Sequence, residues 1–127
     1  MSKQIIHTEN APKAIGPYSQ AVKANGFLYT SGQLGINPET GKLGACVECQ
    51  AHAAMKNIGA ILQKAGLGYA DIIKTTIFVA DLKDFSTVNT VYASYFEGAY
   101  PARSCVQVAA LPLGGLVEIE CIAALNK

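Results

Sequence analysis

Residues 47–66 read VECQAHAAMKNIGAILQKAG and hold the clearest periodic pattern in the chain. The apolar side chains recur at intervals of three and four residues, the spacing of one face of an α-helix. They are Val47, Ala51, Ala54, Met55, Ile58, Ile61, Leu62 and Ala65. Gly66 follows where a helix C-terminus favours glycine. The stretch predicts an amphipathic helix of about five turns.

The sequence after this helix predicts a strand and then a second helix. Residues 72–80 are rich in β-branched and aromatic side chains, which favour a strand. Asp81 or Asp84 can cap the start of the second helix, and Gly98 is placed to end it. Helix, strand and helix therefore follow one another in the middle of the chain.

The two ends of the chain predict the other strands. Asn25-Gly26 is the strongest short hairpin signal and predicts two strands within residues 19–31. Single strands are predicted near 4–8, at 102–109 and at 116–125. The resulting order predicts an α+β fold in one domain, residues 1–127, with two helices on one face of a mixed sheet.

Composition limits the classes of function. Half of the 127 residues are hydrophobic and only 15% are charged, a lean surface that predicts a homo-oligomer. The net charge is +1 and the basic residues are scattered, which argues against nucleic acid as a partner. No apolar stretch approaches the roughly 18 residues of a membrane span. Four cysteines without a signal peptide favour reduced thiols, so we expect a cytoplasmic protein.

Arg103 is the candidate binding residue that stands out, because it lies in an apolar, strand-like segment, PARSCV at 101–106. A guanidinium removed from water needs an anion, which it can hold through two parallel hydrogen bonds. Glu118 and Glu120 in the last strand could be structural partners, or the anion could be a ligand. Strand alternation predicts Arg103, Cys105, Glu118 and Glu120 on the sheet face away from the helices.

Several motifs, in one order along the chain, resemble those of the reactive-intermediate deaminase family, RidA, also called YjgF and described as L-PSP endoribonuclease or translation inhibitor. They are GPYSQA at 16–21, TSGQ at 30–33, NPETG at 37–41, KTTIFV at 74–79 with DL at 81–82, and PARSCV at 101–106. Gln107, Gly35 and the turn at 113–115 depart from the residues common in that family. None of these departures removes a matched site residue.

The resemblance implies a homotrimer of chorismate-mutase-like subunits, with clefts between neighbours that hydrolyse 2-imino acids such as 2-iminobutanoate and 2-iminopropanoate. It implies that Arg103 binds the substrate carboxylate and that Glu118 holds the attacking water. The other implied cleft residues are Tyr18, Ser31, Asn89 and Cys105. No cofactor and no metal are expected. Imine hydrolysis needs no protein nucleophile, because orientation and a positioned base suffice.

Two other functions compete with imine hydrolysis. RNA cleavage or translational inhibition is disfavoured by the near-neutral charge and by the lack of a plausible pair of acid-base histidines. A pure sensor of a carboxylate metabolite would be hindered by Glu118, because a carboxylate repels a carboxylate ligand unless it handles water or protons. Cys105 is expected to be a cleft wall rather than a nucleophile, since no histidine is paired with it in sequence.

Cys46 and Cys49 form a C-x-x-C motif at the start of the first predicted helix, where the helix dipole stabilises thiolates. The motif lacks a preceding strand, and the other cysteines supply no second pair at zinc-site spacing. A redox or metal role is therefore disfavoured from sequence, and the role of the pair stays open.

Overall fold

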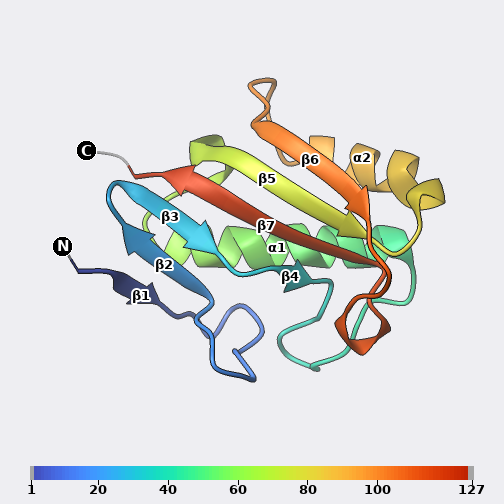
Figure 1. The fold of residues 1–127 in the computed structure, drawn as a ribbon, viewed down its shortest axis with the longest axis horizontal. Coiled ribbons are helices and arrows are strands. Elements are labelled where there is room, and N and C mark those ends of the chain that lie inside the picture. The colour runs from blue at the N-terminus through green and yellow to red at the C-terminus, as the bar shows by residue number, and fades with distance from the viewer. Residues whose placement is uncertain (1, 126–127) are drawn as a thin grey trace.

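One mixed sheet and two helices that cover one of its faces make up the part of the chain that this computed structural model describes, residues 2–125 (Figure 1). The strands are β1 (Gln4–Ile6), β2 (Ala21–Ala24), β3 (Phe27–Thr30), β4 (Gln33–Leu34), β5 (Ile72–Val79), β6 (Ala102–Gln107) and β7 (Val117–Ala124). The helices are α1 (Val47–Lys64) and α2 (Phe85–Ala93), with short 3₁₀ turns at Tyr69–Asp71, Leu82–Asp84 and Pro112–Gly114. The predicted α+β architecture is confirmed.

The sheet has the order β1-β2-β3-β7-β5-β6, and β4 also pairs with β7. β5 and β6 run parallel, joined by a connection that contains α2, and the other pairs are antiparallel. β7 therefore lies in the middle of the sheet and β6 at an edge. Within residues 2–125, neither helix combines the length and the apolar character needed to cross a bilayer.

Helix α1 follows its sequence prediction closely. Its apolar stripe is buried against the sheet, and Met55, Ile58 and Ile61 are fully enclosed. Cys46 caps its start, and Gly66 has a φ of +80° just beyond its end, a conformation that favours glycine. Periodicity and end signals agree here, so the predicted bounds are confirmed.

The predicted hairpin is also confirmed. Asn25 and Gly26 have φ values of 54° and 85°, the left-handed pair that a tight two-residue turn requires. β2 and β3 pair in the register that this turn sets, with Ala24 opposite Phe27.

One predicted boundary is wrong, and one strand was missed. The second helix ends at Ala93 rather than Gly98, because the next amides form tighter bonds to carbonyls three residues back, Tyr95 N–H to Tyr92 among them. The tighter turn lets Tyr95 reach α1, where its hydroxyl lies 2.8 Å from His52 Nδ1. Strand β4 was not predicted, because two residues are too few to show a period.

The prediction that Arg103 and Cys105 lie on the sheet face away from the helices is wrong. In the parallel register of β5 and β6, Arg103 is opposite Thr75 and Cys105 is opposite Ile77. Thr75 and Ile77 are buried, and the Thr75 hydroxyl lies 2.7 Å from the Tyr92 hydroxyl of α2. Arg103 and Cys105 therefore face the helices.

Glu118 and Glu120 do lie on the opposite face, as predicted. The residues that alternate with them in β7 are buried against the helices, while both glutamates are half-buried. Arg103 and Glu118 consequently project from opposite faces of one sheet, and within residues 2–125 no carboxylate forms a salt bridge with Arg103. Within the described chain, Glu118 and Glu120 are therefore not structural ion-pair partners of Arg103.

Candidate active site

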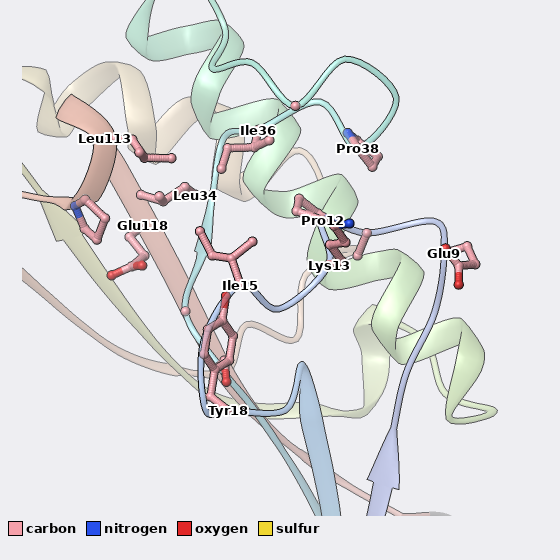
Figure 2. A pocket seen from close by; sticks show the side chains of 15 residues that line it. Glu9, Pro12, Lys13, Ile15, Tyr18, Leu34, Ile36, Pro38, Leu113 and Glu118 are labelled. Atoms are coloured by element: carbon pink, nitrogen blue, oxygen red, sulfur yellow. The ribbon is translucent and has the colours of Figure 1, made fainter.

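Glu118 lies near the start of β7 and faces an open hollow of about 790 Å³, a size typical of small-molecule sites. Figure 2 shows its carboxylate beside Leu34, the residue opposite it in β4. Gly32 also lines the hollow, and a Cβ added there would lie only 2.7 Å from Glu118 Cδ. The glycine is therefore what gives the carboxylate its space.

The environment of Glu118 suits a group that exchanges protons. Burial, and secondarily the negative charge of Glu120, raise the pKa of the Glu118 carboxyl above its ordinary value. In the described chain it has neither a salt-bridge partner nor a side-chain hydrogen bond. Glu118 is thus a half-buried base whose carboxylate is unengaged.

Tyr18 and Ser31 line the same hollow as Glu118. The Ser31 hydroxyl donates to the Ser19 carbonyl at 2.6 Å, and the Ser31 amide donates to the Gln20 carbonyl at 2.9 Å. Tyr18 is half exposed and lies next to Ile15 in the wall of the hollow (Figure 2). One chain thus brings three of the expected cleft residues, Tyr18, Ser31 and Glu118, to the same hollow.

Gln20, which was not predicted as a site residue, stabilises the loop that carries Tyr18. Gln20 is buried, and its amide nitrogen donates to the carbonyls of Thr8 and Pro12, while its side-chain oxygen accepts from the Thr8 amide. One glutamine thereby fixes the loop between β1 and β2. The only sequence signal was its place beside Tyr18 in the GPYSQA segment, which does not show that the amide is buried.

Arg103 and Asn89 form a second group on the other face of the sheet. Arg103 Nη1 donates to Asn89 Oδ1, and the guanidinium carbon lies 5.4 Å from the Phe85 ring centroid and 5.2 Å from that of Tyr92. Aromatic faces attract a cation and limit its movement. An open hollow of about 470 Å³ borders Arg103, Asn89 and Tyr100.

Phe85 and Tyr92 were missed as parts of this group. They lie four residues before and three residues after Asn89, so all three share one face of α2. That spacing was visible in the sequence, but aromatic residues at helical spacing are usually core residues. Only the packing of β6 against α2 shows that they support a guanidinium.

Cys105 shares the helix-facing side of β6 with Arg103 but lines neither hollow. It packs against the core cluster that includes Val88 and Tyr92. Burial raises the pKa of its thiol, and the nearby Arg103 charge only partly opposes this. A thiol held protonated is a poor nucleophile, which agrees with the expectation that Cys105 is not one; its place in a cleft wall is not seen in the single chain.

Comparison with known proteins places the chain in a family. The model of the family described as Endoribonuclease L-PSP matches residues 8–125. The chain belongs to this family. The resemblance to RidA and YjgF proteins that the motifs suggested is thereby confirmed.

The relatives cover nearly the whole chain. Reactive Intermediate Deaminase A, chloroplastic, of Arabidopsis thaliana is 54% identical over 98% of this chain and 67% of its own length. The 2-iminobutanoate/2-iminopropanoate deaminase of Escherichia coli is 52% identical over 97% of this chain and 98% of its own. The crystal structure of E. coli TdcF with bound serine has a TM-score of 0.94 and 48% identity, covering 97% of this chain and 99% of that one.

Proposed function

We propose that this chain hydrolyses 2-imino acids to 2-oxo acids and ammonia, in a cleft that a second copy of the chain completes. The observation that carries the proposal is the division of the site residues. Glu118, Tyr18 and Ser31 line one hollow, whereas Arg103 and Asn89 border another on the opposite face of the sheet. One chain alone does not bring the carboxylate-binding group and the base together.

The surface of the sheet supports assembly with further copies. The face away from the helices carries Tyr29 and Val106, each more than two fifths exposed, and partly buried Phe78 lies between Val106 and Glu118 in the register. A contiguous apolar patch on an exposed sheet face marks an interaction surface. We propose a homotrimer, in which Arg103 of one copy approaches Glu118 of the next.

The proposed reaction assigns a role to each group. Arg103, oriented by Asn89 and the two rings, holds the carboxylate of the imino acid through its planar fork. Glu118 accepts a proton from the water that attacks the C=N carbon, and a carbinolamine forms. With a protonated imine as the starting point, Glu118 returns this proton to the carbinolamine nitrogen and then takes the hydroxyl proton as the C–N bond breaks, so that ammonia leaves and the carbonyl forms. Tyr18 and Ser31 line the water side of the cleft without adding charge.

The names of the relatives support this substrate class, because several of them are called 2-iminobutanoate/2-iminopropanoate deaminase. We propose the cytoplasm as the location, because the four cysteines are free, which suits a reducing compartment.

Trimer formation is the first expected result. Light scattering or sedimentation should give about three times the 13.3 kDa of one chain at micromolar concentration. A stable monomer that hydrolyses 2-imino acids at full rate would contradict the shared cleft, since the monomer separates Arg103 from Glu118.

Mixed trimers give a sharper result. Arg103→Lys and Glu118→Gln chains, each impaired alone, are denatured together and refolded in equal amounts. If Arg103 and Glu118 meet from different copies, about a quarter of the sites recover both native residues by random assortment. Hydrolysis should therefore exceed that of either variant refolded alone. No recovery in trimers shown by mass spectrometry to contain both chains would place the two residues in the same copy.

The pH profile follows from the raised pKa of Glu118. Only the carboxylate can accept a proton, so kcat/KM should fall as the pH falls through this pKa, with a midpoint above the ordinary 4.5. The rate is followed as 2-oxo acid formed from an imino acid that an excess of amino-acid oxidase generates. Glu120→Gln should move the midpoint to lower pH, because it removes a neighbouring negative charge. An unchanged midpoint would show that another group controls the rate.

A further inference from the structure

Cys46 and Cys49 lie together at the start of α1 and take no part in the proposed hydrolysis. Both are exposed, and their sulfur atoms are 2.8 Å apart. Cys46 is the N-cap, with an extended backbone at φ −145° and ψ 168°, and its sulfur accepts the Cys49 backbone N–H at 3.3 Å. The helix start therefore directs a backbone donor and a second thiol toward one sulfur.

This arrangement makes the two thiols unequal. The hydrogen bond between the two side chains, with help from the Cys49 backbone N–H, lowers the pKa of Cys46 below its ordinary value. The same side-chain interaction raises the pKa of Cys49. Cys46 is consequently the thiol that more readily becomes a nucleophilic thiolate, with Cys49 beside it.

The other two cysteines provide a contrast within the same chain. Cys121 is buried in the core, and burial raises the pKa of its thiol to about 12. Cys105 is half-buried, and its pKa is also raised. Exposure, contact with a second thiol and a lowered pKa thus coincide only at the helix start.

A metal is a weaker explanation for the pair. Within residues 2–125, no group of three or more histidine, cysteine, aspartate or glutamate side chains is placed to share an ion. Two thiols leave a tetrahedral zinc site half built. A disulfide needs nothing more than the two sulfurs, which would move from 2.8 Å to about 2.05 Å apart.

An open hollow that Cys49 lines, and Cys46 does not, gives a small reagent room next to the thiol pair. It is about 740 Å³ and is lined by Cys49, His52 and Lys56 on α1 and by Glu9 and Glu39 on the facing loops. Lys56 and the two glutamates suit a molecule that carries both carboxylate and ammonium groups. A low-molecular-weight peptide disulfide has that chemistry.

We propose that Cys46 and Cys49 are a reversible dithiol couple that exchanges with low-molecular-weight disulfides. The Cys46 thiolate attacks one sulfur of the small disulfide, forming a mixed disulfide and releasing one thiolate. Cys49 loses its proton to solvent and attacks the Cys46 sulfur, which closes the Cys46–Cys49 disulfide and releases the second thiolate. The protein loses two electrons, and the small disulfide gains them. The sequence disfavoured a redox role because no strand precedes the C-x-x-C motif, but the contact between the two exposed sulfurs favours it.

The test uses glutathione disulfide on the reduced 127-residue chain, with acid quenching, alkylation of the remaining thiols and peptide mass spectrometry. The wild type should lose two hydrogens, with the bond mapped between Cys46 and Cys49, and dithiothreitol should reverse it. The matched control, Cys105→Ser with Cys121→Ser, should oxidise in the same way. Cys49→Ser should stop at one glutathione on Cys46, because no second thiol can displace it.

The order of attack has its own outcome. Cys46→Ser should take up glutathione at Cys49 at least about tenfold more slowly than Cys49→Ser takes it up at Cys46, at neutral pH. Equal rates, a bond that involves Cys105 or Cys121, or thiols that stay reduced would each overturn the proposal. The Cys46→Ser, Cys49→Ser double variant should hydrolyse 2-imino acids like the wild type. The redox proposal and the proposed hydrolysis are therefore tested independently.

Discussion

Glu118→Gln is expected to reduce turnover of a 2-imino acid by about 100-fold or more, the range associated with a positioned general base. Glutamine keeps the shape of the side chain in the space that Gly32 provides, but it cannot accept the proton of the attacking water. The reaction is followed as release of 2-oxobutanoate from an imino acid generated in situ.

Binding of the product separates a catalytic role from a binding role for Glu118. The variant should bind 2-oxobutanoate at least as tightly as the wild type, because a negative charge near the ligand carboxylate has been removed. Calorimetry or ligand-induced thermal stabilisation measures this affinity. Glu120→Gln is the matched control: it removes a carboxylate two residues along the same face of β7 and should retain turnover at neutral pH. Wild-type turnover by Glu118→Gln would show that another group handles the water.

Arg103→Lys is expected to weaken 2-oxo acid binding and kcat/KM together, by about 10- to 100-fold, the worth of a lost charged hydrogen bond. Lysine keeps the positive charge but loses the fork that grips both carboxylate oxygens, and its compact head cannot stack on Phe85 and Tyr92 in the same way. Because the carboxylate is held in the ground state and in the transition state alike, affinity and efficiency should fall in parallel.

A nearby cation provides the control for Arg103. Lys83→Gln removes a charge just before α2, from a lysine that is paired with Asp81 on the surface, and should change neither quantity. Measuring 2-oxobutanoate affinity for the two variants distinguishes the fork from general charge. If Arg103→Lys bound 2-oxobutanoate as well as the wild type, Arg103 would not be the carboxylate-binding residue.

Much of the fold could be predicted from the sequence where the signal is local. The apolar stripe of α1 and the Asn25-Gly26 turn depend on residues a few positions apart, so their bounds agree with the structure. Short or irregular elements could not be predicted in this way. The two residues of β4 are a strand only because β7 lies beside them, and the turns that end α2 early are ones that bring Tyr95 to α1.

The candidate site residues could be named from the sequence. Arg103 stood out in an apolar strand, and the others followed from motifs that resemble those of a known family. Their arrangement in space came only from the tertiary structure. An alternating strand shows which side chains share a face, but it cannot show which face meets the helices. That choice was made by the parallel pairing of β6 with β5, which places Arg103 opposite the buried Thr75, while Glu118 of β7 projects from the other face. The physical reason is that register and sheet order depend on contacts between distant segments, so only the folded chain shows that Glu118 and Arg103 lie on opposite faces of the sheet.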